Sequence, residues 1–259
     1  MDLQCSALFS IQDLTHPGNK RSYSPFYIQD RIRYFKNILQ EVNGGLIALD
    51  LLKSTDLVCV VIALVEEHTP FVFLPPHTSP HIFRAHWYFN GNQPIKLDVV
   101  GREDGENDFA NLCYCIKTSG TTGAAKVVGV PLHCIATNIE DFRNRFNITC
   151  NDVVLFSTSL QFDPSFVEIF LATVTGACLL IVPDSVIKQP HHLAEVIMTV
   201  LGGEQFPIDL VNRYRNIKNP TKIFNVYGIT EMSCWASVYE VKPSNTDSLE
   251  YVIYAIAIL

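Results

Sequence analysis

The sequence has few charged residues and no excess of basic ones, which narrows the classes of protein to which it can belong. Only 17% of its 259 residues are charged, and acidic residues outnumber Lys and Arg, so the net charge is −7. Domains that bind nucleic acids usually carry a basic face. We therefore expect no nucleic-acid partner, and any anionic ligand must be held by groups placed locally.

Metal-binding cysteine patterns, a secretion signal and long apolar runs are also missing. None of the eight cysteines forms a C-x-x-C pair or has the Cys/His spacing that zinc requires. Met1 to Cys5 lack the positive start and the apolar core of a signal peptide. The apolar tail 249–259 has 11 residues, whereas a helix needs about 20 to cross a bilayer. We expect a cytoplasmic protein with no membrane partner, whose tail is either a buried strand or foreign to the fold.

The apolar residues, 48% of the chain, follow patterns that alternate between strand and helix. Helices are predicted at about 24–42, 54–67, 131–146, 164–173 and 191–201. Strands are predicted at 46–51, 71–74, 112–117, 153–156, 178–182 and 223–227. Asn90-Gly91 predicts a hairpin between 87–89 and 95–97. This alternation predicts an α/β fold with mostly parallel sheets flanked by helices.

A polar loop between two predicted strands has a composition suited to a polyphosphate. Residues 118–126 read Thr-Ser-Gly-Thr-Thr-Gly-Ala-Ala-Lys. Glycines allow the backbone to approach an anion closely, hydroxyl and N–H groups donate hydrogen bonds, and Lys126 adds a positive charge. The loop is not that of the P-loop NTPases, because Gly120 and Gly123 are three apart and Val127 follows Lys126. An ordinary Ser/Thr/Gly turn is the alternative.

Two further polar segments follow predicted strands. Asp163-Pro164 opens a predicted helix, so Asp163 is an N-cap, a carboxylate that receives a ligand ammonium group, or both. Residues 225–231, Asn-Val-Tyr-Gly-Ile-Thr-Glu, offer an aromatic face to a flat base, a hydroxyl to a phosphate and a carboxylate to Mg²⁺. A strand followed by a simple turn is the alternative there. Open α/β sheets bind their ligands at the carboxyl ends of strands, which favours the functional interpretation.

Taken in order, four motifs resemble the core motifs of the adenylate-forming superfamily, which comprises acyl-CoA synthetases, luciferases and the adenylation domains of nonribosomal peptide synthetases. The motifs are 118–126, 162–165 (Phe-Asp-Pro-Ser), 202–204 (Gly-Gly-Glu) and 225–231. The resemblance covers about residues 111–241, and more weakly 46–76. It implies ATP-dependent activation of a carboxylic acid as an acyl-adenylate, followed by thioester formation on a phosphopantetheine carrier or coenzyme A.

The resemblance also implies roles for individual residues. Lys126, Thr230 and Glu231 would be catalytic, with Glu231 also a ligand of Mg²⁺, and Asp163 would bind the amino group of the substrate. The other motif residues would bind ATP: Thr118, Ser119, Gly120, Thr121, Thr122, Gly123, Gly202, Gly203, Glu204, Asn225, Tyr227 and Gly228.

The sequence departs from the superfamily pattern in three places. Ala125 and Val127 replace a proline and a glycine beside Lys126, the stretch between residues 183 and 202 is short, and no counterpart of the C-terminal subdomain follows Glu231. We therefore expect residues 1–248 to be a partial AMP-binding N-terminal domain with an internal deletion, incomplete for catalysis.

The resemblance leaves the substrate open. A fatty acid has no ammonium group to pair with Asp163, so we expect an amino acid such as β-alanine. The alternatives are an acyl-CoA synthetase acting on a fatty acid and a catalytically inactive nucleotide-binding or regulatory protein.

Overall fold

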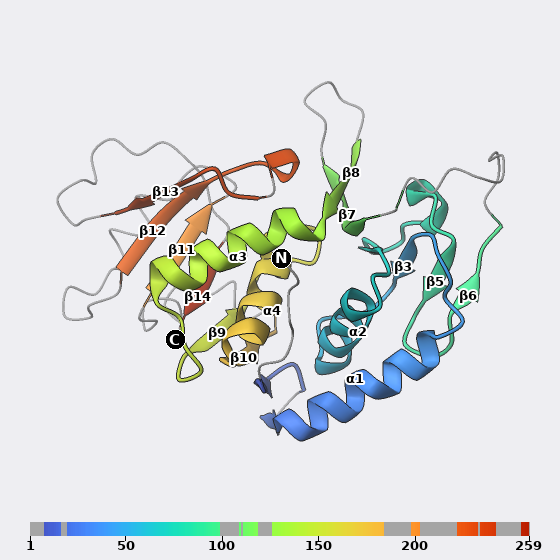
Figure 1. Ribbon diagram of the computed structural model, residues 1–259, viewed down its shortest axis with the longest axis horizontal. Helices are drawn as coiled ribbons and strands as arrows, with labels where there is room; N and C mark the ends of the chain where they lie inside the picture. Colours follow the sequence, from blue (N-terminus) through green and yellow to red (C-terminus); the bar gives the residue numbers. More distant parts are fainter. Residues whose placement is uncertain are drawn as a thin grey trace.

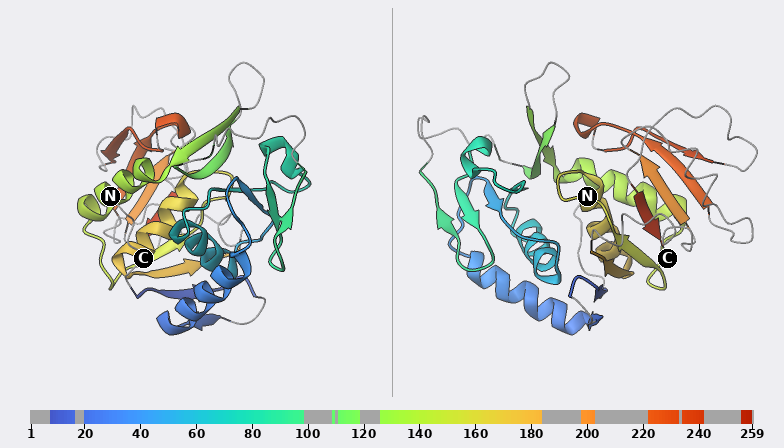
Figure 2. Two further views of the ribbon diagram at one scale, coloured as in Figure 1. Left: turned by 45° about the vertical axis from the view of Figure 1, so that its right-hand side comes forward. Right: turned by 180° about the vertical axis from the view of Figure 1, so that it is seen from behind.

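The computed structural model contains two β-sheets, with helices between and around them (Figures 1 and 2). It describes residues 8–16, 20–98, 109, 111–118, 126–183, 198–202, 222–232, 234–241 and 255–258. One sheet has six strands and the other has eight. The mixed α/β architecture predicted from the sequence is therefore confirmed.

The six-stranded sheet has the order β6-β5-β3-β4-β7-β8. Its strands are β3 (Ile47–Leu49), β4 (Phe71–Phe73), β5 (Trp87–Phe89), β6 (Ile95–Lys96), β7 (Leu112–Thr118) and β8 (Lys126–Pro131). The four central strands are parallel, and β6 and β8 pair antiparallel at the two edges. Helices α1 (Pro25–Leu39) and α2 (Thr55–Glu66) and the 3-10 helix η1 (Pro80–Phe83) accompany this sheet. The predicted hairpin is present as β5 and β6.

The eight-stranded sheet has the order β13-β12-β11-β14-β9-β10-β1-β2. Its strands are β1 (Ser10–Asp13), β2 (Arg21–Tyr23), β9 (Val153–Phe156), β10 (Cys178–Ile181), β11 (Met198–Gly202), β12 (Lys222–Tyr227), β13 (Ser237–Glu240) and β14 (Ala255–Ile258). The strands β1, β10 and β9 run parallel, as do β11 and β12. Strand β14 joins these two groups and is antiparallel to both neighbours. Helices α3 (Leu132–Phe146) and α4 (Pro164–Thr175) and the 3-10 helix η2 (Thr230–Met232) belong to this half.

For two segments of this sheet, the prediction from the sequence was wrong or left alternatives open. The helix predicted for 191–201 is wrong for its last residues, because residues 198–201 belong to β11, which pairs in parallel with β12; residues 191–197 lie outside the described part. A short apolar run is compatible with helix or strand, and here the partner strand decides. For the apolar tail, the strand alternative holds at residues 255–258, which form β14.

Helix α4 lies between the two sheets and contacts both (Figure 1). It packs against β9 and β10, and the ring of its Phe166 stacks on Tyr114 of β7 at a centroid distance of 3.8 Å. The same ring stacks on Phe73 of β4 at 5.3 Å. All residues of α4 from Pro164 to Thr173 are buried, as expected for a helix with apolar residues on every face.

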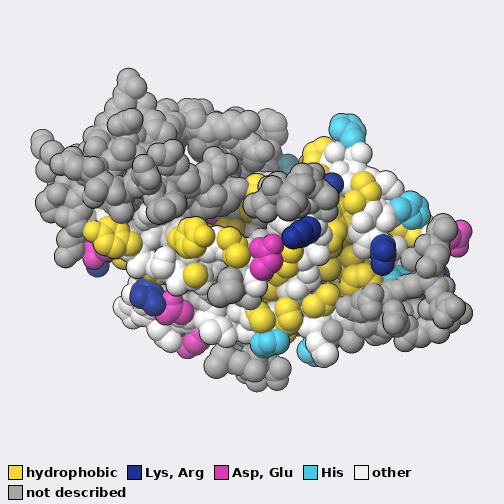
Figure 3. Space-filling model, turned by 90° about the horizontal axis from the view of Figure 1, so that it is seen from above, with side chains coloured by type: hydrophobic (Ala, Val, Ile, Leu, Met, Phe, Trp, Pro, Cys, Tyr) yellow, Lys and Arg dark blue, Asp and Glu magenta, His cyan; other side chains and the backbone are white. Residues whose placement is uncertain are grey.

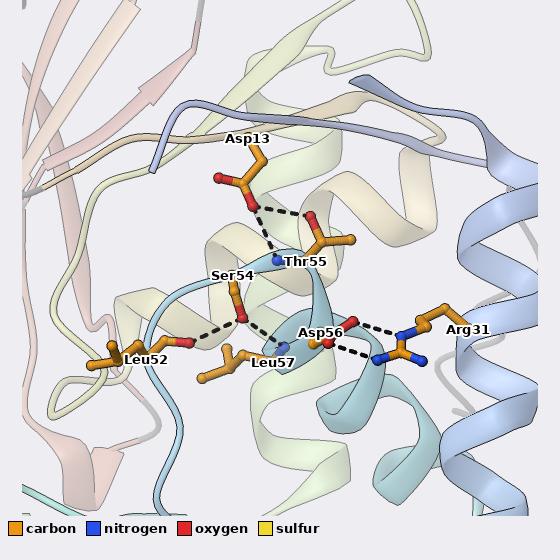
Figure 4. A network of polar contacts seen from close by, with 7 residues as sticks. All are labelled: Asp13, Arg31, Leu52, Ser54, Thr55, Asp56 and Leu57. Atoms are coloured by element: carbon orange, nitrogen blue, oxygen red, sulfur yellow. Dashed lines mark hydrogen bonds and ion pairs between the residues drawn. The ribbon is translucent and has the colours of Figure 1, made fainter. Parts of the chain in front are cut away.

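A second connection between the two halves lies at the start of α2 (Figure 4). The carboxylate of Asp13, at the end of β1, accepts hydrogen bonds from the backbone N–H (3.4 Å) and hydroxyl (3.2 Å) of Thr55. Negative charge is favoured at a helix N-terminus, where backbone N–H groups are free. One residue further on, Asp56 forms a bidentate ion pair with Arg31 of α1 at 2.7 and 2.8 Å. Strand β1 and the helices α1 and α2 are thereby linked.

Candidate functional site

The predicted phosphate loop joins the antiparallel strands β7 and β8. Thr118 ends β7 and is paired with Lys126, which begins β8 and is exposed. The two strands predicted on either side of this segment are therefore confirmed. The residues between them, including Ser119, Gly120, Thr121, Thr122 and Gly123, lie outside the described residues. Strand β8 contacts η2, which carries the predicted Thr230 and Glu231.

The segments expected to frame the adenine lie side by side at the carboxyl ends of β11 and β12. Gly202, the last residue of β11, is paired with Val226 of β12. Next to it, Asn225 is buried, and its Oδ1 atom has no hydrogen-bond partner in the described part of the chain. Tyr227 ends β12 and is 54% exposed. Gly203 and Glu204 lie outside the described residues.

Gly228 is required by packing at the turn that follows β12. A Cβ atom at this position would collide with the backbone carbonyl of Cys234. The same turn is held by a hydrogen bond from the N–H of Ala236 to the carbonyl of Tyr227, at 2.7 Å. The glycine therefore fixes the course of the chain around η2, whether or not it also faces a ligand.

Asp163 lies at the centre of the described site and joins residues from three elements. Its Oδ1 accepts a hydrogen bond from the hydroxyl of Tyr114 on β7 at 2.8 Å, and its Oδ2 accepts one from the hydroxyl of Thr230 on η2 at 2.5 Å. Asp163 itself precedes α4 and is 4% exposed. The structure thus brings together two predicted site residues, Asp163 and Thr230, that are 67 positions apart.

Only part of the capping interpretation of Asp163 is correct. Asp163 occupies the N-cap position with Pro164 in the first turn, and its carbonyl accepts from the N–H of Phe166 at 2.9 Å. Its side chain makes no capping hydrogen bond. The reason is its helical backbone conformation (φ −49°, ψ −38°), since a side-chain cap normally requires extended angles. The carboxylate is therefore free to meet the two hydroxyl groups.

Burial dominates the electrostatics of Asp163. It raises the pKa of the carboxyl group, the hydrogen bonds from Thr230 and Tyr114 oppose that rise, and the nearby Glu231 carboxylate adds to it. Glu231 itself is exposed. None of the ion pairs in the described part of the chain includes Asp163. The site therefore contains a buried carboxylate that no ion pair of the described residues neutralises and whose pKa the Glu231 carboxylate raises further, an environment that favours a cationic ligand group.

A second buried carboxylate, Glu168 of α4, belongs to a network between the sheets. It accepts hydrogen bonds from the hydroxyls of Ser157 (3.0 Å) and Thr158 (2.8 Å) and from the N–H of Thr158 (3.1 Å). Burial raises the pKa of Glu168 to about 7, and the positive charge of Lys53 opposes this. Lys53, which lies between β3 and α2, donates to the carbonyl of Ser157 at 2.9 Å. This network fixes the end of β9 to α4 and to the other half of the molecule.

Tyr114 and Glu168 were not singled out from the sequence. Both residues lie in apolar runs, Tyr114 in 112–116 and Glu168 in 164–173. A tyrosine in an apolar strand is typical of a core residue, and a single glutamate in an apolar helix is typical of an exposed position. The partner of Tyr114 is 49 residues away, so no local pattern marks it. Trp235 was also missed: its Nε1 is buried and has no hydrogen-bond partner among the described residues.

On the face seen from above, the Lys, Arg, Asp and Glu side chains of the described residues are interspersed (Figure 3). Within the described residues no three His, Cys, Asp or Glu side chains are grouped to hold a metal ion, and no helix is long and apolar enough to cross a membrane. A cavity of about 140 Å³ between the end of α2 and the start of β7, lined in part by His68 and Asn111, contains no predicted site residue.

The class of protein follows from comparison with known families and structures. Residues 77–200 match the family described as AMP-binding enzyme. The structure resembles the crystal structure of IdnL1 (TM-score 0.73, 16% identity), covering 96% of this chain and 64% of that one. It also resembles the Vibrio cholerae adenylation domain AlmE, solved in complex with glycyl-adenosine-5'-phosphate (TM-score 0.66, 16% identity, 90% and 59% coverage). At these identities the likeness is one of fold, and the fold is that of adenylation domains.

Among sequence relatives, the chain is 39% identical over 222 residues to the Beta-alanine-activating enzyme of Mus musculus. It is 43% identical over 167 residues to the enzyme of the same name from Danio rerio. The matches cover 64% and 50% of this chain, but only 20% and 14% of those proteins. The chain is thus a homologue of adenylate-forming enzymes that spans about a fifth or less of the length of these relatives.

Proposed function

We propose that this site binds ATP and an amino acid, such as β-alanine, and joins them as an aminoacyl-adenylate. The observation that carries the proposal is the Asp163 carboxylate, buried and held by Tyr114 and Thr230 without a cationic partner in the described part of the chain. A primary ammonium group is a ligand that satisfies both its charge and its free lone pairs. Fatty acids carry no such group.

The nucleotide half of the proposal rests on the ends of β7, β8, β11 and β12. The unpartnered acceptor of Asn225 suits the exocyclic amine of adenine, and the exposed ring of Tyr227 offers it a stacking face. Lys126 would bind the β- and γ-phosphates with Ser119, Thr121 and Thr122, and Gly203 and Glu204 would complete the adenine site. Because no three His, Cys, Asp or Glu side chains of the described residues are grouped to hold a metal ion, Mg²⁺ at Glu231 would also need phosphate oxygens as ligands.

In the proposed reaction a carboxylate oxygen of the amino acid attacks the α-phosphorus of ATP. The bond from that phosphorus to the oxygen bridging to the β-phosphate breaks, and pyrophosphate leaves with its Mg²⁺. Lys126 would stabilise the charge that develops on the phosphoryl oxygens. Asp163, to which the Thr230 hydroxyl donates its one proton, would hold the ammonium end in place. In a second step a phosphopantetheine thiol would attack the carbonyl, releasing AMP and a proton.

The relatives support the substrate class. Those of greatest identity cited above are named for the activation of β-alanine, and the AlmE complex contains a glycyl adenylate. Both are amino acids, which fits the ammonium site that we assign to Asp163.

ATP–pyrophosphate exchange with a panel of acids tests the proposal. The 259-residue chain, which we expect to be incomplete for catalysis, should bind ATP without exchange. In the full-length parent protein we expect exchange with β-alanine or another amino acid, lost in Lys126→Ala and retained in Lys117→Ala, a neighbouring exposed lysine outside the predicted motif residues. Faster exchange with fatty acids than with amino acids would favour the fatty-acid alternative. In the parent protein, binding of ATP without exchange for any acid would favour an inactive nucleotide-binding protein.

A further inference from the structure

Tyr114 is buried completely and held rigidly, yet its hydroxyl group faces the candidate site. Its ring is stacked on Phe166 at 3.8 Å with an interplanar angle of 14°, and it lies 6.4 Å from the ring of Phe71. Its backbone is paired with β4 on one side and with β8 on the other. Few side chains in the described part of the protein are fixed from so many directions, so its hydroxyl has a well-defined position.

That hydroxyl donates to Oδ1 of Asp163, while Thr230 donates to Oδ2. A carboxylate offers about four lone-pair directions, two on each oxygen. Each oxygen of Asp163 therefore accepts one hydroxyl, one from β7 and one from η2. The two hydroxyls together fix the plane of the carboxylate and the direction of the remaining lone pairs.

Tyr114 is also part of the strand that carries the predicted phosphate loop. It lies four positions before Thr118, the last residue of β7. The same rigid strand thus determines where the loop begins and where the Asp163 carboxylate is held.

We propose that Tyr114 is a positioning residue for amino-acid recognition, which orients the Asp163 carboxylate toward the substrate ammonium group. This inference rests on the proposed function and adds to it a residue that acts through Asp163. The hydroxyl also stabilises the ionised carboxylate, because a hydrogen bond to the charged form favours that form. A purely structural role would instead be satisfied by the ring alone.

The test compares two non-hydrolysable adenylate analogues: β-alanyl sulfamoyl-adenosine and its propionyl counterpart, which lacks the amino group. Their dissociation constants are measured by calorimetry with the wild-type chain and with Tyr114→Phe, which keeps the stacked ring. We expect the variant to lose about tenfold or more in affinity for the amino analogue, as for loss of a hydrogen bond to a charged group, and less than about twofold for the propionyl analogue. Its amino-analogue affinity should also fall more steeply than that of wild type as the pH is lowered.

Tyr88→Phe is the matched control. Tyr88 makes a hydrogen bond of the same kind, to Asp50 at 2.7 Å, but on the exposed surface. The Tyr88→Phe variant should bind both analogues with the same dissociation constants as the wild type. Equal losses for both analogues in Tyr114→Phe, or an unchanged preference for the amino analogue, would overturn the positioning role and leave the proposed function standing.

Two further outcomes separate the inference from its foundation. If the wild type binds neither analogue, or binds both equally, the proposed amino-acid function and this inference fail together. If Tyr114→Phe does not melt cooperatively, a ring-fluorinated tyrosine at position 114 replaces it. The fluorinated residue keeps the shape of the tyrosine ring, and its hydroxyl is a stronger hydrogen-bond donor to Asp163. It should therefore raise the affinity for the amino analogue alone at about pH 5. If the affinity for the amino analogue does not change selectively, the inference is wrong.

Discussion

The two sheets differ in how far apart in the sequence their neighbouring strands lie. All strands of the six-stranded sheet fall between residues 47 and 131, and its most distant pairs, Ile47 with Trp87 and Phe71 with Tyr114, lie about 40 residues apart in the sequence. In the eight-stranded sheet, β1 pairs with β10 across more than half the chain, and β14 enters between β9 and β11 from residues 255–258. Distant pairings carry larger loop-closure costs and depend on more of the chain. We therefore expect the six-stranded sheet to be the less sensitive of the two to distant changes.

Deletion of residues 249–259 should produce the largest difference between the sheets. It removes β14 and leaves β9 and β11 with unpaired edges in the middle of the sheet. We expect hydrogen exchange to accelerate strongly at Val154 and Leu155, which β14 faces, and to change little at Val72 and Tyr114 in the other sheet.

Two results would contradict this expectation. Unchanged protection in β9 would mean that the tail does not hold the sheet together in solution. Equal loss in both sheets would mean that the two halves unfold as one cooperative unit.

The same difference explains what the sequence could and could not predict. In the six-stranded sheet, local periods predict the strands, and the turn residues Asn90-Gly91 predict the β5–β6 hairpin, whose two strands are consecutive in the chain. In the eight-stranded sheet the type of β11 depends on β12, and the place of β14 depends on β9, about 100 residues earlier. No pattern within the segments carries that information.

The candidate site shows the same limit. The motifs gave Asp163, Asn225 and Thr230 as separate candidates, and the ends of predicted strands indicated one common edge. The contact between Asp163 and Thr230, and the part played by Tyr114, come from packing of α4 against β7. A stacked tyrosine in an apolar strand has no sequence signature that distinguishes it from a core residue.

The Glu168→Ala variant should be the next largest perturbation. It leaves the hydroxyls of Ser157 and Thr158 and the N–H of Thr158 without their buried acceptor, and removes the negative charge near Lys53. We expect the free energy of unfolding to fall by about 3 to 5 kcal/mol. Glu140→Ala, at an exposed position of α3 bonded to Asn144, should cost less than about 0.5 kcal/mol. Similar losses in the two variants by denaturant titration would contradict the buried network.

The pH dependence of stability should reveal the ionisation of Glu168. Its pKa is raised from 4.5 to about 7, so the folded state binds the proton more tightly than the unfolded state. Stability from this group is therefore present at low pH and is lost as the pH rises from about 4.5 to 7, by about 3 kcal/mol in all. Glu168→Gln removes this titration while leaving the other groups in place. The difference in unfolding free energy between wild type and Glu168→Gln should shift by that amount across this window, and a constant difference would show that Glu168 does not titrate there.

The smallest expected effect compares one glycine from each sheet. At Gly228, after β12, a Cβ would collide with backbone atoms of Cys234, which cannot move without displacing the turn that carries η2. At Gly129 of β8 the Cβ would meet the end of the flexible Leu112 side chain, which can rotate away. We expect Gly228→Ala to lower the free energy of unfolding by about 1 to 3 kcal/mol, and Gly129→Ala to lower it clearly less.

The same two substitutions should differ in ligand binding. Because η2 places the Thr230 hydroxyl on Asp163, Gly228→Ala should weaken binding of the β-alanyl analogue more than Gly129→Ala does. Equal effects of the two substitutions on melting temperature and on analogue affinity would show that the turn after β12 adjusts as readily as a core side chain.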